Sequence, residues 1–141
     1  MAVRQVTVFI ANKEGRIEKV TEILNENGIN IISLSLAESA DFGLLRLIVQ
    51  DPEKAKCVLK DSGLSAKTTN VIAVSIPNVP GSLHTLLTSI KDFNIEYMYV
   101  LTSEKMASMI LKIRDIEAAE EHLRREGFTL LSEEKINESF V

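Results

Sequence analysis

Two short stretches combine the residue types that bind anions at the start of a helix. Residues 78–83 read NVPGSL and residues 12–17 read NKEGRI, and each stretch follows an apolar, strand-like run. The first N–H groups of a helix have no partner inside the helix, and they lie at the positive end of its dipole. A capping side chain or a bound anion such as a carboxylate can therefore satisfy them. We call these stretches the first glycine turn (12–17) and the second glycine turn (78–83).

Each turn residue has a predicted role. Asn12 and Asn78 are expected to cap the two helices through their side-chain oxygens. Pro80 is expected to set φ in the first helical turn. Gly15 and Gly81 remove the side chain where a ligand or another backbone could approach closely. Capping alone would also explain these residues, so the turns by themselves leave both interpretations open.

The two turns belong to a repeat that runs through the whole chain. Asn12, Gly15 and Ile17 correspond to Asn78, Gly81 and Leu83 at a constant offset of 66 residues. Further along, two more pairs correspond at an offset of 64: Asp51 with Asp115, and Gly63 with Gly127. The change in offset predicts that the second hairpin turn is two residues shorter than the first.

Hydrophobic periodicity places strands and helices around the turns. Strands are predicted where β-branched and alternating residues gather, at 3–11, 29–37, 42–50, 70–76, 94–102, 106–113 and 128–132. Helices are predicted after each glycine turn and after Asp51 and Asp115, with a short helix or a frayed end in the polar tail 133–141. Each half thus reads βαββαβ, the ferredoxin-like unit. The fold class is α+β, with antiparallel sheets covered by helices on one face and with domains at 1–69 and 70–141.

Composition narrows the functional class. The chain has 141 residues, 45% of them hydrophobic and 26% charged, as in a folded protein. A net charge of −4 argues against a nucleic-acid-binding protein. No apolar run approaches the ~20 residues of a membrane helix, and no signal sequence is evident, so we expect a cytoplasmic protein. The single cysteine, Cys57, allows no intrachain disulfide, gives no metal-site spacing, and is interpreted as a packing residue.

No catalytic constellation is evident, and we expect no enzyme activity, metal or cofactor. His84 and His122 lie in helical stretches without a paired nucleophile. The βαββαβ order also serves RNA-recognition motifs, metal chaperones and acylphosphatases. The central strands lack the aromatic residues of the first class, there is no cysteine pair for the second, and no glycine-rich anion loop with arginine is present for the third.

Three motifs, each present twice, resemble the ACT domain. They are the glycine turns NKEGRI and NVPGSL, the helix-to-strand passages NGINIISLSLA and FNIEYMYVL, and the apolar strands with an acidic helix start, FGLLRLIVQDPEKA and MILKIRDIEAA. The resemblance covers nearly the whole chain and is strongest to stand-alone tandem ACT proteins. It implies a sensor of small molecules, usually amino acids.

The resemblance also implies where a ligand binds. In ACT domains the ligand lies between the glycine turn of one unit and strand two of a neighbouring unit. The implied ligand-binding residues here are Asn12, Lys13, Glu14, Gly15, Arg16, Ile17, Asn30, Ile31, Asn78, Val79, Pro80, Gly81, Ser82, Leu83, Glu96, Tyr97 and Met98. Asn30 and Glu96, aligned with each other at the offset of 66, are expected to accept from a ligand ammonium. Glu14 replaces the family's usual proline and brings a negative charge to the first site.

Two functions remain open at this point. The first is an amino-acid-binding regulatory protein, with a branched-chain or aromatic ligand favoured by the apolar residues of strand two. The second is a structural interaction module without a ligand, acting as the regulatory subunit of an enzyme. With either function, the protein would consist of small units with apolar sheets, and we expect a homodimer to cover this apolar surface. An unidentified protein is a further expected partner.

Overall fold

The computed structural model describes residues 3–11, 13–39, 41–102 and 107–140. The chain divides into two compact units, Arg4–Thr69 and Asn70–Phe140, with Val3 grouped with the latter. We call them the first unit and the second unit, and describe each by itself.

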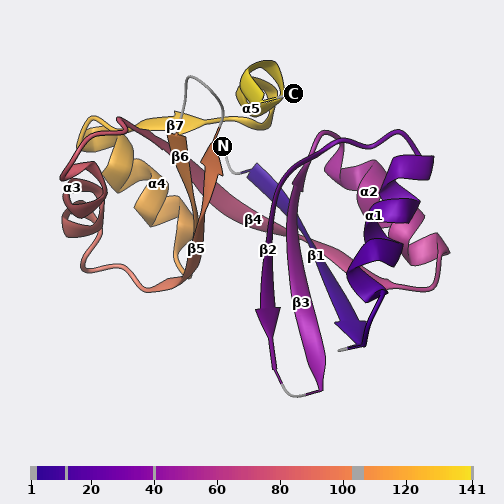
Figure 1. The fold of residues 1–141 in the computed structure, drawn as a ribbon. Helices are drawn as coiled ribbons and strands as arrows, with labels where there is room; N and C mark the ends of the chain where they lie inside the picture. The colour runs from indigo at the N-terminus through magenta and orange to yellow at the C-terminus, as the bar shows by residue number, and fades with distance from the viewer. Residues whose placement is uncertain (1–2, 12, 40, 103–106, 141) are drawn as a thin grey trace. The chain divides into compact units, whose positions relative to one another are not determined.

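The first unit is a four-stranded antiparallel sheet with two helices on one face (Figure 1). Its elements are β1 (Val3–Ala11), α1 (Arg16–Glu26), β2 (Ile31–Glu38), β3 (Phe42–Val49), α2 (Pro52–Asp61) and the first part of β4 (Ser65–Ile76). The strand order is β2-β3-β1-β4, which is the ferredoxin-like order. Residues 65–69 of β4 belong to this unit.

The second unit repeats this arrangement, with strand order β5-β6-β4-β7. It contains residues 70–76 of β4, then α3 (Ser82–Ser89), β5 (Ile95–Thr102), β6 (Ala107–Ile113), α4 (Ile116–Arg125), β7 (Thr129–Leu131) and α5 (Glu133–Phe140). In Figure 1, α3 and α4 cover one face of its sheet. The predicted α+β fold class is thus confirmed, and the polar tail forms a helix.

Each unit builds its core from strand residues that alternate toward the helices. In β1, Val6, Val8 and Ile10 face α1 and α2, and all three are buried. Leu45 and Leu47 on β3 complete this layer. The second unit has an equivalent cluster on β4, α3, β6 and α4, made of Ile72, Val74, Leu86, Ile90, Met109, Leu111, Ile113, Ala119 and Leu123. Aliphatic residues fill both cores, as the low aromatic content predicts.

The structure corrects where the two halves differ in length. The cross-strand pair Ile31–Val49 corresponds to Ile95–Ile113, an offset of 64 on both strands of the hairpin. The hairpin turns are therefore equal in length, and the predicted shorter second hairpin was wrong. The two-residue difference lies between the first helix and the second strand, where α1 has 11 residues and α3 has 8.

This corrected alignment changes which strand-two residues are equivalent. The carbonyl of Asn30 accepts from Gln50 N at 3.0 Å, and the carbonyl of Asn94 accepts from Arg114 N at 3.3 Å. Asn94, and not Glu96, is thus the counterpart of Asn30. Glu96 lies where the register between β5 and β6 shifts, between Ile95 and Tyr97. The pairing of β2 with β3 shifts at the corresponding place, between Ile31 and Ser33.

Candidate functional site

The second glycine turn is a β-turn followed directly by a helix. Ser82 N donates to the Val79 carbonyl at 3.3 Å, and Gly81 has φ 89° and ψ −13°. A type II turn requires a positive φ at its third position, which glycine provides, and proline is common at its second position. Because α3 begins at Ser82, Pro80 lies before the helix. The prediction that Pro80 sets φ in the first helical turn was wrong, and it constrains the β-turn instead.

The first glycine turn has the same backbone at its glycine and different side chains around it. Gly15 has φ 78° and ψ 0°, and α1 begins at the next residue, Arg16. Glu14 stands where the second turn has its proline, between the exposed residues Lys13 and Gly15. Asn12 lies outside the described residues. The first turn is thus charged, whereas the second is uncharged and partly apolar.

In the part of the chain that the structure describes, neither turn caps its helix with a side chain. The N-cap residues are Gly15 and Gly81, and neither α1 nor α3 receives a side-chain capping hydrogen bond. The predicted capping role of Asn78 is wrong, because the β-turn places it three residues before the N-cap. The backbone bonds of α3 begin with Thr85 N donating to the Gly81 carbonyl at 2.9 Å. The second and third N–H groups of α3 therefore remain available to an anion.

The structure predicts different costs for the cap variants. Asp115 caps α4 by accepting from Ala118 N at 3.5 Å, so Asp115→Ala should lower the unfolding free energy by about 1 kcal/mol. Asn78→Ala should change it by less than about 0.5 kcal/mol, because no cap bond is lost. Both residues lie in the second unit, which holds both tyrosines of the chain, Tyr97 and Tyr99. Urea unfolding followed by tyrosine fluorescence measures the unfolding free energy of both variants. Equal losses of unfolding free energy would contradict the conclusion that Asp115 caps its helix and Asn78 does not.

Glycine is required at these turns by backbone conformation and not by crowding. A Cβ built on Gly15 or Gly81 would meet no atom within 4 Å, so the space beside each turn is open. A positive φ near 80° is disfavoured for residues with a side chain. Among the described residues, none makes the close approach that was expected at these glycines.

Within one unit, the structure does not bring the predicted strand-two residues to the glycine turn. Strands β4 and β5 are both antiparallel to β6, so they run parallel to each other. Ile76, just before the second glycine turn, pairs with Ala107, which in turn pairs with Thr102 at the end of β5. Glu96 lies near the beginning of β5, at the opposite end of the sheet. Asn30 and Ile31 are placed in the same way relative to the first turn.

The predicted residues of β5 also face in different directions. Glu96 Oε2 lies 3.2 Å from Lys112 Nζ, so its carboxylate is already paired with a cation. Tyr97 lies opposite Lys112, and its ring stacks on that of Tyr99 with centroids 6.5 Å apart. Met98 packs on the other face, against the core under the helices. Tyr97 and Met98 therefore cannot both contact one ligand bound to the same strand of one unit.

Sequence reasoning missed an apolar residue near the second turn. Val100 lies opposite Met109 on the helix side of β5, toward the end of the strand that is close to the turn. It is 51% exposed, and Val79 and Leu83 of the turn are 59% and 43% exposed. One indication of this residue was present in the sequence, because Val100 is apolar and lies on the side of an edge strand that faces the core. Such a residue would normally be expected to be buried.

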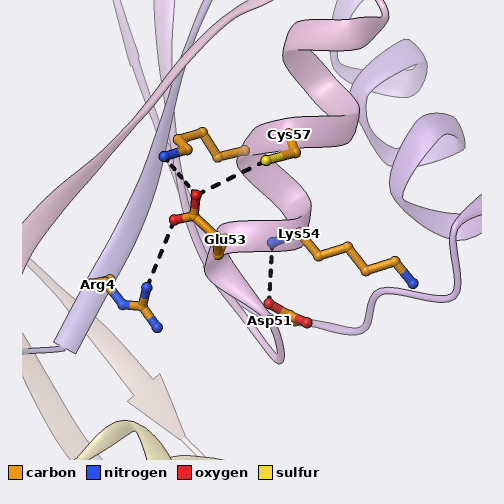
Figure 2. A network of polar contacts seen from close by, with 6 residues as sticks. Arg4, Asp51, Glu53, Lys54 and Cys57 are labelled. Carbon is orange, nitrogen blue, oxygen red and sulfur yellow. Dashed lines mark hydrogen bonds and ion pairs between the residues drawn. The ribbon is translucent and has the colours of Figure 1, made fainter.

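A separate polar network lies at the start of α2. Figure 2 shows Arg4 on one side of the Glu53 carboxylate. Arg4 Nη1 lies 3.8 Å from Glu53 Oε2, and Lys56 Nζ lies 2.9 Å from Glu53 Oε1. The hydrogen bond and charge of Lys56 lower the pKa of the Glu53 carboxyl below its usual range. Cys57 is exposed, with Sγ 4.0 Å from Glu53 Oε1, so its interpretation as a packing residue was wrong. This network connects α2 to β1 and does not include the glycine turns.

Within the described ranges, no three His, Cys, Asp or Glu side chains are grouped so that they could hold a metal ion. No helix in that part of the chain is both long and apolar enough to cross a bilayer.

Comparisons with known proteins agree with the fold and show the family. The crystal structure of protein BT0572 from Bacteroides thetaiotaomicron is 37% identical, with a TM-score of 0.91, and the match covers 97% of this chain and 96% of that one. The ligand-free regulatory subunit of aspartate kinase from Thermus thermophilus matches at 21% identity and a TM-score of 0.67, over 90% and 94% of the two chains. No curated protein matches significantly. Residues 1–139 match the ACT domain pair, and the chain therefore belongs to the ACT domain pair family.

Proposed function

We propose that this protein is an amino-acid-binding regulatory protein and that the second glycine turn receives the α-carboxylate of the ligand. The observation that carries the proposal is the uncapped start of α3. Its early N–H groups lack a capping side chain, Gly81 leaves open space beside them, and no acidic side chain lies in the first turn of the helix. This is the arrangement that binds an anion at a helix N-terminus.

The family and its relatives support a regulatory role. ACT domains are regulatory modules, and one structure similar to this chain is named as the regulatory subunit of aspartate kinase. We therefore propose that the chain has no catalytic activity of its own and acts by changing how it associates when a ligand binds. A ligand can shift such an equilibrium only if it binds the two states with different affinities.

The side chain of the proposed ligand is apolar. Val79, Leu83 and Val100 are exposed near the second turn without any charged neighbour in the turn itself. A branched-chain or aromatic amino acid would cover such surface, which favours binding by about 25 cal/mol for each Å² buried. The first turn is the weaker candidate because Glu14 places a negative charge where a carboxylate would lie.

A second copy of the chain is the proposed source of the missing strand-two contacts. The beginning of β5 lies at the far end of its own sheet, so Glu96 and one of Tyr97 and Met98 can reach a ligand at the second turn only from a neighbouring unit. We propose a homodimer for this reason. The proposed cytoplasmic location stays a prediction.

The test is a thermal-shift screen against the twenty amino acids, followed by calorimetry on any that stabilises the protein. A ligand that binds only the folded state should stabilise it by about 2.7 kcal/mol at 100 times its dissociation constant. We expect an apolar amino acid to produce the largest shift. If none stabilises the protein at millimolar concentration, the sensor proposal fails.

The alternative function is an interaction module that serves as a regulatory subunit without a ligand. Exposed apolar side chains on both units, among them Phe9 and Phe42 with ring centroids 6.1 Å apart, favour contact with another protein. A silent amino-acid screen together with a stable complex between the purified chain and an enzyme subunit would support this function.

A further inference from the structure

His122 connects α4 to the end of α3 in the second unit. Its Nε2 lies 2.7 Å from the carbonyl oxygen of Ser89, the last residue of α3. A carbonyl can only accept a hydrogen bond, so this partner assigns the tautomer of His122 that carries a hydrogen on Nε2. The Ser89 hydroxyl and the Glu126 carboxylate are farther from the same nitrogen, at 3.4 Å and 3.8 Å. The Ser89 carbonyl is therefore the main acceptor.

This bond completes the C-terminal end of α3. The last carbonyl groups of a helix have no partner inside the helix. At the end of α3, the carbonyls of Leu86 and Thr88 accept from the backbone N–H groups of Ile90 and Lys91, and no basic residue lies in the last turn. The Ser89 carbonyl instead receives a donor from another helix. α3 thus ends on a tertiary contact, whereas its start has no side-chain cap.

Packing holds the His122 ring in place. The ring lies against that of Phe93, with centroids 5.4 Å apart and an interplanar angle of 46°. Phe93 itself packs against the core of the second unit. The His122 side chain is 28% exposed, so most of it is removed from water. Because the imidazole is held between an aromatic ring and a carbonyl, its hydrogen bond restrains the end of α3 in one position.

α3 depends on such a restraint more than α1 does. It has eight residues, of which Leu86 is buried, whereas α1 has eleven residues, of which three are buried. Ile90, directly after α3, is the other buried anchor of this helix. From Ser82 to Ser89 the helix rises only about 10 Å, so a tilt at its end also reorients the N–H groups at its start.

The first unit restrains the end of its first helix with a different residue. Lys54 Nζ, on α2, donates to the carbonyl of Asn27, directly after α1, at 2.8 Å. By the offset of 64, the counterpart of Lys54 is Ala118 and that of His122 is Val58. Both units therefore connect the second helix to the C-terminal end of the first, but with residues at positions that do not correspond. The shared connection indicates that each unit requires its first helix to be held.

We propose that His122 is a positioning residue of the second glycine turn. By holding the C-terminal end of α3, it fixes the direction of the N–H groups at the start of the helix, to which the ligand carboxylate would bind. The inference rests on the proposed function and deepens it, because it names a residue outside the turn that controls affinity. The coupling is reciprocal, so a ligand at the start of α3 also stabilises the bond at its end.

Two substitutions of His122 separate the hydrogen bond from the bulk of the side chain. His122→Leu removes the donor and keeps an apolar side chain, whereas His122→Gln places an amide N–H near the position of Nε2. The probes are L-isoleucine and L-phenylalanine, and calorimetry measures their dissociation constants. We expect His122→Leu to weaken binding of the tighter probe at least about fivefold. His122→Gln should keep the dissociation constant within about twofold of the original, and failure of this rescue would overturn the role of the donor.

Two further variants are the controls. Asp115→Ala removes the side-chain cap of α4 and lowers the stability of the same unit without changing a contact of α3. Lys54→Met removes the corresponding connection in the first unit. Each should leave the dissociation constant within about twofold. If Asp115→Ala weakens binding as much as His122→Leu does, a general loss of stability explains both results and the proposal is overturned.

A measurement without any ligand separates this inference from the proposed function. The backbone N–H resonances of Leu83 and His84, in the first turn of α3, are recorded by NMR. These groups lie about 9 Å or less along the helix from Ser89, so a change in the tilt of α3 reaches them. We expect His122→Leu to shift both resonances, and His122→Gln and Asp115→Ala to leave them nearly unchanged.

The outcomes of this measurement are distinct from those of the ligand screen. Unchanged resonances in His122→Leu would overturn the positioning role, whether or not an amino acid binds. Shifted resonances in a protein that binds neither probe and no other amino acid would support the role of His122 in placing α3 and overturn the sensor function.

Discussion

Gly81→Leu is expected to weaken binding of the amino acid identified in the screen by at least about tenfold, while the second unit remains folded. The backbone at Gly81 has φ 89°, which a residue with a side chain adopts only at a cost. Relaxation toward negative φ would reorient the N–H groups at the start of α3. A leucine that keeps the native conformation would instead extend into the open space beside the turn. Calorimetry at fixed temperature measures the loss.

Gly127→Leu is the matched control for backbone strain. Gly127 has φ 88°, no atom within 4 Å of a built Cβ, and a place in the same unit after α4. Its substitution should cost similar stability, of order 1 kcal/mol, and leave ligand affinity unchanged. Gly15→Leu reports on the first glycine turn in the same way. Equal loss of affinity in the Gly81 and Gly127 variants would mean that strain, and not the turn, controls binding.

Leu86→Ala is expected to lower the unfolding free energy of the second unit by about 2–5 kcal/mol. Leu86 lies on α3, is fully buried, and belongs to the core cluster between that helix and the sheet. Truncation removes apolar contacts and leaves a cavity that the surrounding aliphatic residues fill only in part. Urea unfolding followed by tyrosine fluorescence reports this unit alone, since Tyr97 and Tyr99 are the only tyrosines and there is no tryptophan.

Leu83→Ala makes the same chemical change one helical turn earlier. Leu83 is exposed in the second glycine turn, so its truncation should cost less than about 1 kcal/mol. We expect it to reduce affinity for an apolar ligand, since it removes surface that the ligand would cover. Equal destabilisation by the two truncations would show that the start of α3 is packed more tightly than the structure indicates.

The repeat and the fold class were predictable from sequence because they depend on local patterns. The strand periodicity of Val6, Val8 and Ile10 requires only that one face of a sheet be buried, and the structure confirms it. Gly28, Gly63 and Gly127 were readable as helix ends because a positive φ strongly favours glycine, and all three have it. Asp51 and Asp115 were readable as helix starts for an equally local reason.

The detailed alignment of the repeat was not predictable in this way. Two offsets, 66 and 64, were visible in the sequence, but nothing local showed where one changed to the other. Only the ladder of β5 against β6 placed the change between helix and strand and replaced Glu96 by Asn94 as the counterpart of Asn30. Backbone pairing is a non-local property, and a two-residue slip preserves the alternation of faces.

By itself, the sequence determined a tandem α+β protein with a glycine turn before a helix in each half, because glycine, proline and apolar periodicity act within a few residues of one another. The tertiary structure decided the backbone and side-chain surroundings of the predicted site residues. It placed Pro80 in a β-turn before the helix, left α3 without a side-chain cap, and paired Glu96 with Lys112. It also showed that the second strand of the unit, β5, begins at the end of the sheet that is opposite to the glycine turn. These features depend on which strands pair and in which direction, and residues distant in sequence decide that together.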